Sequence, residues 1–335
     1  MSPAGRGKPR SPKARSPKPR SLRTSKPAPG KPRSSKPAPG KPRSSKPGGR
    51  AAPRPYQSRG AGRTGPIRTP DGRDGRGDSK PTKSPVKNLG GEQIEGRQAV
   101  RELLIAQRRK VHEVLVAGDL EGDESIEGIV ALAAANRVPL SYIGRTKLEA
   151  TARSEAPQGV LARAAALPEA EFATLIRRRP GRAPFLVAID SVTDPGNLGA
   201  IIRSCDGAGV DGVILPRHRA VHVTPTVAKA AAGAIEHVPI AVVPGLPAAL
   251  SRLRDAGIWI VGLDDDAERT LFDLGDLAAE GVCLVLGAEG TGLSRLVRER
   301  CDTVLSIPMR GRLSSLNVSA AAALAVYEVV RHRSA

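Results

Sequence analysis

The sequence predicts an α/β protein in which a parallel sheet forms the carboxyl-terminal domain and a smaller α/β domain precedes it. From residue 184 to residue 335, short apolar runs alternate with helix-like segments, a pattern typical of a parallel sheet covered on both faces. Residues 91–167 contain a shorter series of the same kind, which is enough for a modest core. Residues 1–90 have almost no large apolar side chains, so we expect a disordered tail. A polar linker over residues 168–183 joins the two domains.

Basic residues concentrate in the amino-terminal tail. Residues 1–90 hold 25 Lys and Arg against three acidic residues, a net charge of +22, whereas the whole chain carries +20. Residues 91–335 therefore sum to −2. The tail also repeats the ten residues Ser25–Ser34 unchanged at Ser35–Ser44. Positive charge without aromatic side chains predicts phosphate contact that does not depend on base sequence, and the alternative is a merely solubilising extension.

The chain shows no signal for export or membrane insertion. No apolar segment follows the basic amino terminus, and no apolar run reaches membrane-spanning length. The three cysteines, Cys205, Cys283 and Cys301, are unclustered and odd in number, which predicts buried thiols and no metal site. We therefore expect a cytoplasmic protein that uses neither a metal nor a membrane.

In the small domain, the spacing of apolar residues predicts three helices and three strands. The helices are expected over residues 94–104, with Ile94 and Gly96 at the helix entry, and over 126–135 and 147–153; the strands are expected over 111–117, 139–143 and 158–164.

In the large domain, six apolar runs alternate with five helix-like segments. The strands are expected over residues 185–190, 212–215, 238–243, 258–262, 282–286 and 303–307, and the helices over 198–208, 226–234, 247–256, 293–300 and 317–330. Loops at the carboxyl ends of such strands are where ligands usually bind.

Three of these loops carry ordered motifs. They are Asp190-x-x-x-Asp-Pro-x-Asn-x-Gly199, Leu286-Gly-Ala-Glu-Gly290, and Ile307-Pro-Met followed by Ser315-Leu-Asn-Val-Ser319. In this order they resemble the three motifs of the SpoU (TrmH) family, which are RNA ribose 2′-O-methyltransferases. The resemblance implies a SPOUT-type domain with a trefoil knot, and it implies S-adenosylmethionine as the cofactor.

The resemblance also assigns the cofactor to the second and third loops, where Gly287, Ile307 and Leu316 match positions that contact it. Main-chain groups can satisfy the donors and acceptors of adenine, and glycines let the backbone approach closely. A dinucleotide-binding loop is the alternative, but the spacing of Gly287, Gly290 and Gly292 does not fit that fingerprint.

Five polar residues are the predicted catalytic set: Arg203, Asn197, Glu289, Ser315 and Asn317. The family assigns proton abstraction to Arg203, although a guanidinium that fixes the adjacent phosphate and stabilises alkoxide charge is equally physical. Asn197 either caps its helix or holds the ribose. Glu289 either orients Arg203 or Asn317, or compensates a helix dipole in a first turn. Ser315 and Asn317 flank Leu316 and position the ribose or Arg203.

The small domain resembles an RNA-binding domain that some SpoU enzymes share with certain ribosomal proteins, through the segment Ile94–Val100. Arg97 and Arg101 stand one helical turn apart, so both could face one phosphate backbone, and a solvated charged face is the alternative.

The combined resemblance implies methylation of a guanosine 2′-hydroxyl in 23S ribosomal RNA. The alternatives are a tRNA ribose 2′-O-methyltransferase and a non-catalytic RNA-binding factor for ribosome assembly. Small residues in the last helix, together with the family resemblance, further predict a homodimer.

Overall fold

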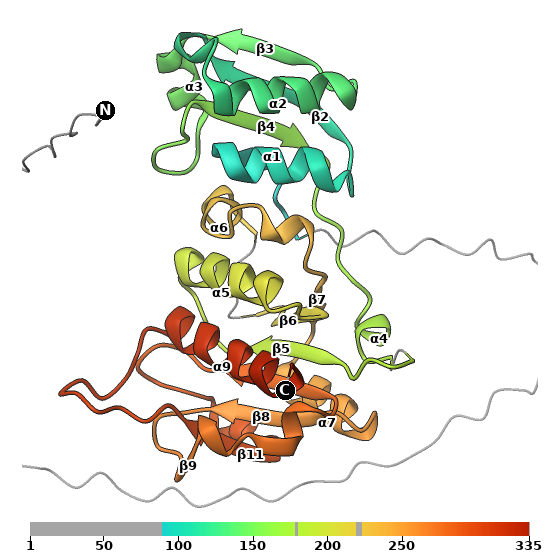
Figure 1. Cartoon of the computed structure of the whole chain (residues 1–335), viewed down its shortest axis with the longest axis vertical. Helices are drawn as coiled ribbons and strands as arrows, with labels where there is room; N and C mark the ends of the chain where they lie inside the picture. The colour runs from blue at the N-terminus through green and yellow to red at the C-terminus, as the bar shows by residue number, and fades with distance from the viewer. Residues whose placement is uncertain (1–88, 178–179, 219–222, 335) are drawn as a thin grey trace, which may run out of the picture. The chain divides into compact units, whose positions relative to one another are not determined.

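A computed structural model describes residues 89–177, 180–218 and 223–334, so residues 1–88 of the predicted tail lie outside the described residues. The predicted boundary at residue 90 was wrong, because Leu89 is buried and Gly90 pairs with Val223. A seven-stranded sheet in the order β7-β6-β5-β10-β8-β11-β9 forms the carboxyl-terminal part, and all neighbouring strands run parallel (Figure 1). The strands are β5 (Phe185–Ile189), β6 (Gly212–Pro216), β7 (Ile240–Val243), β8 (Trp259–Leu263), β9 (Arg269–Thr270), β10 (Val282–Leu286) and β11 (Thr303–Ser306).

Helices cover both faces of this sheet, as the apolar strands predicted. They are α5 (Pro195–Gly207), α6 (Pro225–Ala230), α7 (Leu246–Asp255), α8 (Arg295–Arg298) and α9 (Val318–Arg333). Alternate side chains of β10 enter two different cores: Leu284 and Leu286 pack with α5 and α9, whereas Cys283 and Val285 pack with α7. The side chains on both faces of this central strand are therefore buried. The predicted doubly covered parallel sheet is confirmed.

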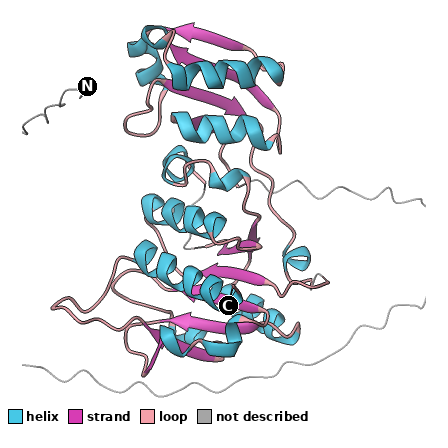
Figure 2. Ribbon diagram, in the orientation of Figure 1, coloured by secondary structure: helices cyan, strands magenta, loops and turns pink. Residues whose placement is uncertain are grey.

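The small domain is a four-stranded mixed sheet in the order β1-β4-β2-β3, packed with helices (Figure 2). Its elements are β1 (Gln93–Glu95), α1 (Arg97–Ala106), β2 (Val111–Ala117), α2 (Glu124–Ala135), β3 (Leu140–Ile143), α3 (Arg145–Thr151) and β4 (Val160–Ala164). A short helix, α4 (Phe172–Leu175), follows in the predicted linker.

Two local predictions of the fold were wrong. Ile94 does not begin a helix; it is the middle residue of β1, pairs with Ala162 and is fully buried. The helix expected over residues 226–234 is interrupted, because α6 ends at Ala230 and Gly233 takes a positive φ of 89° before a 3₁₀ turn. A three-residue strand and a six-residue helix are too short for apolar periodicity to identify.

The cysteines are free thiols in apolar surroundings. Cys205 and Cys283 are buried, and Cys301 is partly buried. Burial raises the pKa of Cys205 to about 12 and, together with nearby Asp302, the pKa of Cys301 to about 12. Within the described residues, no helix is long and apolar enough to cross a membrane.

A buried ion pair links the small domain to the large one. The guanidinium of Arg109 donates to both carboxylate oxygens of Glu236, at 3.1 and 2.5 Å, and also to the carbonyl oxygens of Gly91 and Ala165, at 2.6 and 2.7 Å. Both charged side chains are at most 2% exposed. A buried charge pair is stable only when its remaining polar groups are satisfied, as they are here. Because Arg109 and Glu236 come from different domains, their hydrogen bonds restrict how the two domains can pack on each other.

Glu236→Gln should destabilise the protein by about 3–5 kcal/mol, because it leaves the Arg109 charge buried without a counter-ion. Urea unfolding measures the change. The exposed pair Arg145–Asp119 provides a control, since Arg145→Met should cost less than about 1 kcal/mol. Equal stability losses in the two variants would contradict the importance of the buried pair.

Candidate active site

Four neighbouring strands end together at one edge of the large sheet. Leu286 of β10 pairs with Ile189 of β5 on one side and with Leu263 of β8 on the other, and Leu263 pairs with Leu305 of β11. This register brings loops that are far apart in sequence to one place. A pocket of about 730 Å³, including its open part, lies among them.

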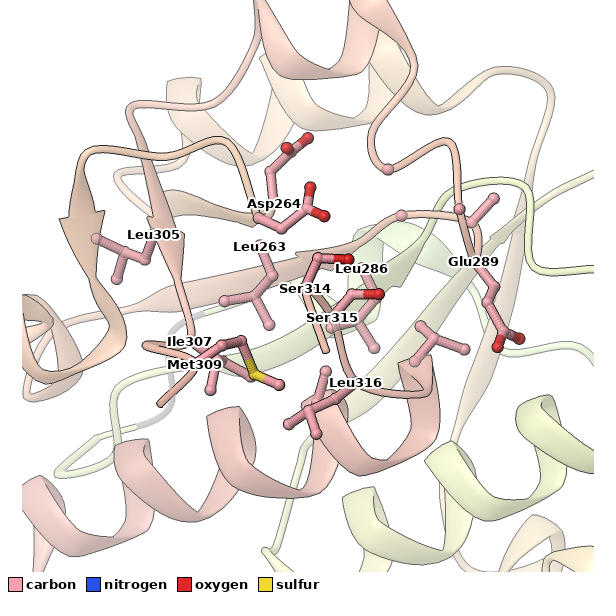
Figure 3. Close-up of a pocket in the computed structure, with 17 residues that line it drawn as sticks. Leu263, Asp264, Leu286, Glu289, Leu305, Ile307, Met309, Ser314, Ser315 and Leu316 are labelled. Carbon is pink, nitrogen blue, oxygen red and sulfur yellow. The ribbon is translucent and has the colours of Figure 1, made fainter. Parts of the chain in front are cut away.

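The pocket is lined by apolar side chains, backbone and three carboxylates (Figure 3). In this view Ile307, Met309 and Leu316 lie together below Asp264. The lining residues are Leu263, Asp264, Asp265, Leu286, Gly287, Ala288, Glu289, Gly290, Gly292, Leu305, Ile307, Met309, Ser314, Ser315, Leu316, Val318 and Ala321. All three residues predicted to contact the cofactor, Gly287, Ile307 and Leu316, are therefore in one pocket.

The loop after β10 folds back on its own backbone. Ala288 and Gly292 exchange two N–H···O hydrogen bonds of 3.0 Å. A Cβ on Gly287 would stand 2.3 Å from the carbonyl carbon of Gly292, so no larger residue fits there without moving the backbone. Gly292 has a φ of 62°, a left-handed conformation that glycine adopts without strain. The close approach predicted for these glycines is present, and it is an approach of the loop to itself.

Two carboxylates that the sequence analysis did not select hold the end of this loop. Asp264, after β8, accepts from the Leu293 backbone N–H at 3.3 Å and pairs with Arg298 at 2.7 Å. Asp190, after β5, accepts from the Ser294 backbone N–H at 2.8 Å. Burial alone would raise the pKa of Asp264, but Arg298 and backbone N–H donors bring it below its ordinary value.

A chain of side-chain hydrogen bonds joins the three motif loops. Asn317 donates to the Oδ1 of Asn197 at 2.9 Å, and Asn197 donates to a carboxylate oxygen of Glu289 at 3.3 Å. The capping role considered for Asn197 is wrong, because Asp194 accepts from the Asn197 backbone N–H at 2.6 Å and caps α5. Glu289 is not in a helical first turn either, since α8 begins only at Arg295.

Arg203 lies on α5, outside the set of pocket-lining residues. Its side chain is exposed, and it makes no hydrogen bond or ion pair within the part of the chain that the structure describes. Neither Glu289 nor Asn317 binds it in this structure. This guanidinium, on the same helix as Asn197, is available to an anionic ligand such as a phosphate.

The two arginines expected to contact RNA lie on α1, in the small domain. The guanidinium of Arg97 already binds the carboxylate of Asp123 at 3.0 Å and the hydroxyl of Ser125 at 2.6 Å. Arg101 pairs with its neighbour Glu102 at 3.0 Å and remains half-exposed. RNA contact by Arg97 would therefore compete with an internal ion pair.

The donor set fits S-adenosylmethionine better than a metal ion. A sulfonium and an ammonium suit a pocket with carboxylates, and the glycine backbone and apolar side chains of the lining suit adenine. Among the described residues, Asp264, Asp265 and Asp266 could bring carboxylate oxygens within 4.8 Å of one another. Asp264 already forms an ion pair with Arg298, however, and Asp265 and Asp266 are exposed.

Comparison with known proteins decides the family. Residues 184–327 match the SpoU rRNA methylase family, and residues 93–170 match the substrate-binding domain of RNA 2′-O ribose methyltransferases. The 23S rRNA (guanosine-2′-O-)-methyltransferase RlmB of Pseudomonas aeruginosa is 39% identical over 247 residues, which cover 72% of this chain and 97% of that protein. The chain belongs to the SpoU rRNA methylase family.

Solved structures of SpoU methyltransferases share the fold. AviRb from Streptomyces viridochromogenes, in complex with the cofactor AdoMet, is 30% identical with a TM-score of 0.61, over 72% of this chain and 89% of that one. A crystal structure of an RNA 2′-O ribose methyltransferase is 26% identical with a TM-score of 0.60, over 72% and 89% of the two chains.

Asp264→Asn should weaken the binding of S-adenosylhomocysteine about tenfold, because it removes the charged acceptor that fixes Leu293 and Arg298. Titration calorimetry measures the affinity. Asp266→Asn is the matched control, because this exposed carboxylate makes no ion pair with a described residue and its loss should change the affinity less than twofold. Equal affinities of the two variants for S-adenosylhomocysteine would contradict the role of Asp264 in holding the loop after β10.

The stabilising interactions of Asp264 with Leu293 and Arg298 should depend on pH. Because the pKa of Asp264 is lowered from 3.8 in the folded protein, its contribution to stability is complete above this value and disappears as pH falls through the lower folded value. The stability difference between the parent and Asp264→Asn, measured by thermal unfolding, should therefore be constant near neutral pH and shrink below about pH 4.

Proposed function

We propose that this SpoU protein methylates the 2′-hydroxyl of a guanosine in 23S ribosomal RNA, with S-adenosylmethionine as the methyl donor. The observation that carries the proposal is the convergence of the second and third motif loops on one pocket. The hydrogen bonds from Asn317 through Asn197 to Glu289 join the first motif to them. The choice of a 23S guanosine rests on the relatives named RlmB, with which the chain aligns over nearly their whole length.

When bound, S-adenosylmethionine supplies an electrophilic methyl group, and Gly287, Ile307 and Leu316 would hold it, largely through backbone groups. The protein must then align the ribose oxygen and help its proton to leave. We assign ribose positioning to Ser315 and to the linked amides of Asn197 and Asn317. Glu289 fixes the orientation of the Asn197 amide, since it accepts from its Nδ2.

Arg203 is proposed to act on the RNA side of the site. Its guanidinium is exposed and unpaired within the described residues, so binding a phosphate breaks no internal contact. From there it stabilises negative charge that develops on the 2′-oxygen. Proton abstraction by Arg203 is the alternative, and it requires a guanidinium that gives up its proton, which is unfavourable in water and in most protein sites.

Arg203→Ala should abolish methyl transfer while S-adenosylhomocysteine binding stays unchanged, because Arg203 does not line the pocket. The assay uses labelled S-adenosylmethionine with 23S rRNA and, in parallel, tRNA. Turnover within about tenfold of the parent, a barrier change below about 1.4 kcal/mol, would contradict the role of Arg203. If the unchanged protein labels tRNA and not 23S rRNA, the tRNA ribose methyltransferase is favoured. If it labels neither RNA, a non-catalytic assembly factor is favoured.

The domain plan follows the same proposal. We assign RNA binding to residues 91–167, methyl transfer to residues 184–335 with a carboxyl-terminal trefoil knot, and non-specific RNA contact to the tail at residues 1–88. The four-stranded and seven-stranded sheets and the two family matches support the first two assignments. The composition of the tail supports the third.

A homodimer is also proposed. Ala322 and Ala325, two of the small residues expected to permit close helix contact, are buried inside the protein, where α9 packs on α5. The same helix leaves Leu324 and Tyr327 each 50% exposed, which offers an apolar face to a second copy. Tyr327→Glu should shift the protein toward monomer in sedimentation velocity. If sedimentation of the unchanged protein shows only monomer at micromolar concentration, and this monomer is active, the proposal is wrong.

A further inference from the structure

The pocket is acidic inside. Asp264, Asp265 and Glu289 line it, and Arg298 pairs with Asp264 alone. Within the described residues, Asp265 and Glu289 have no basic partner. Such a lining attracts a cationic cofactor and repels a polyanion, because like charges in a partly desolvated site oppose each other strongly. An RNA substrate therefore needs positive charge close to the pocket to offset this repulsion.

The loop between β11 and α9 carries such charge. Met309, Ser314 and Ser315 of this loop line the pocket, and Arg310 and Arg312 lie between Met309 and Ser314 in sequence. Both arginines are exposed. Neither makes a hydrogen bond or ion pair with any residue that the structure describes.

Three other arginines of the loops and elements beyond β8 and β10 are engaged by the protein itself. Arg298 binds Asp264 at 2.7 Å, Arg295 binds Glu299 at 3.2 Å, and Arg269 donates to the Asp273 carbonyl at 3.0 Å. Residues 89–177, 180–218 and 223–334 offer Arg310 and Arg312 no such partner. Two adjacent free guanidiniums repel each other, so an isolated folded chain gains nothing from keeping them together.

We propose that Arg310 and Arg312 bind the RNA phosphates that flank the target ribose. The inference rests on the proposed function, since it names the part of the site that receives RNA. Arg203 would act at the reacting nucleotide from α5, and the two loop arginines would hold the strand on the wall of the site that the third motif forms. An acidic pocket for the cofactor and a basic rim for the RNA are then separate parts of one site.

The chemistry of the loop suits this ligand. The chain bends at Gly311 and Arg312, and two residues span at most about 7 Å even when extended, so the two guanidiniums can reach neighbouring phosphates of one strand. Arginine binds a phosphate bidentately, and Gly311 between the two adds no side chain that would obstruct the approach. Leu313 is 75% exposed, so the same loop also offers an apolar surface to the face of a base.

A second copy of the chain is the competing occupant of this loop. Residues 91–335 have a net charge of only −2, so these residues of a second copy offer far less negative charge than an RNA strand does. The location of the loop on the pocket wall also favours the substrate, which must reach this pocket.

The test compares the double variant Arg310→Gln/Arg312→Gln with the control Arg252→Gln/Arg300→Gln in the full-length protein. Both control arginines are exposed: Arg252 lies on α7, over the ring of Phe172, and Arg300 comes after the end of α8. These two helices pack on the other face of the sheet from α5 and α9. Binding to a 23S rRNA fragment is measured by fluorescence anisotropy at several salt concentrations, and steady-state methylation gives KM and kcat.

The loop variant should bind RNA at least about tenfold more weakly than the control. The slope of log affinity against log salt should become shallower by about 1.5, since two phosphate contacts are lost. Its KM for RNA should rise while kcat at saturating RNA stays within a few-fold, and S-adenosylhomocysteine affinity should not change.

RNA affinity and salt slope equal to those of the control would overturn the proposal. So would loss of the dimer in sedimentation with unchanged RNA binding, which would assign the loop to a second copy. The binding measurement is independent of catalysis: a parent that binds RNA through these arginines but transfers no methyl group would refute the proposed function and leave this inference standing.

Discussion

The site depends on the way the chain leaves β10. This strand lies between β5 and β8 in a parallel sheet, so the three strands end at the same level and their loops must share the space beyond. Gly287 is the first residue after the strand, and the chain folds back against it so tightly that a Cβ would meet the backbone of Gly292. The loop lines the pocket with Gly287, Gly290 and Gly292, which place no side chain in it. This suits a cofactor that the backbone recognises.

Charge then separates the two ligands of the proposed reaction. The carboxylates lie in the pocket, and one of them, Asp264, also fixes the loop through Leu293 and Arg298. The free guanidiniums lie outside it, on α5 and on the third motif loop. Hydrogen bonds join the amide of Asn317 to the amide of Asn197, and the amide of Asn197 to the carboxylate of Glu289. They connect α5, which carries Arg203, to the second and third motif loops. A cationic methyl donor and an anionic RNA strand can therefore meet without sharing one set of contacts.

The sequence was most informative where one strong pattern dominates. The parallel strands are continuous apolar runs, so β10 was predicted over its full range, and ordered motifs placed Gly287, Ile307 and Leu316 in one site. It was least informative where partners are remote: Asp190 binds Ser294 across 104 positions, and Arg109 binds Glu236 across 127. Local chemistry also left Asn197 ambiguous, because Asp194 and Asn197 are both good helix caps and only the folded loop selects Asp194.

The most direct test of this account is a crystal structure of the protein with S-adenosylhomocysteine. The account predicts the ligand between the loops after β8, β10 and β11, in contact with Gly287, Ile307 and Leu316. It also predicts that the Asn317–Asn197–Glu289 hydrogen bonds persist and that Arg203 does not touch the ligand. A ligand bound elsewhere, or one that displaces Asp264 from Leu293 and Arg298 to bind it directly, would contradict the account.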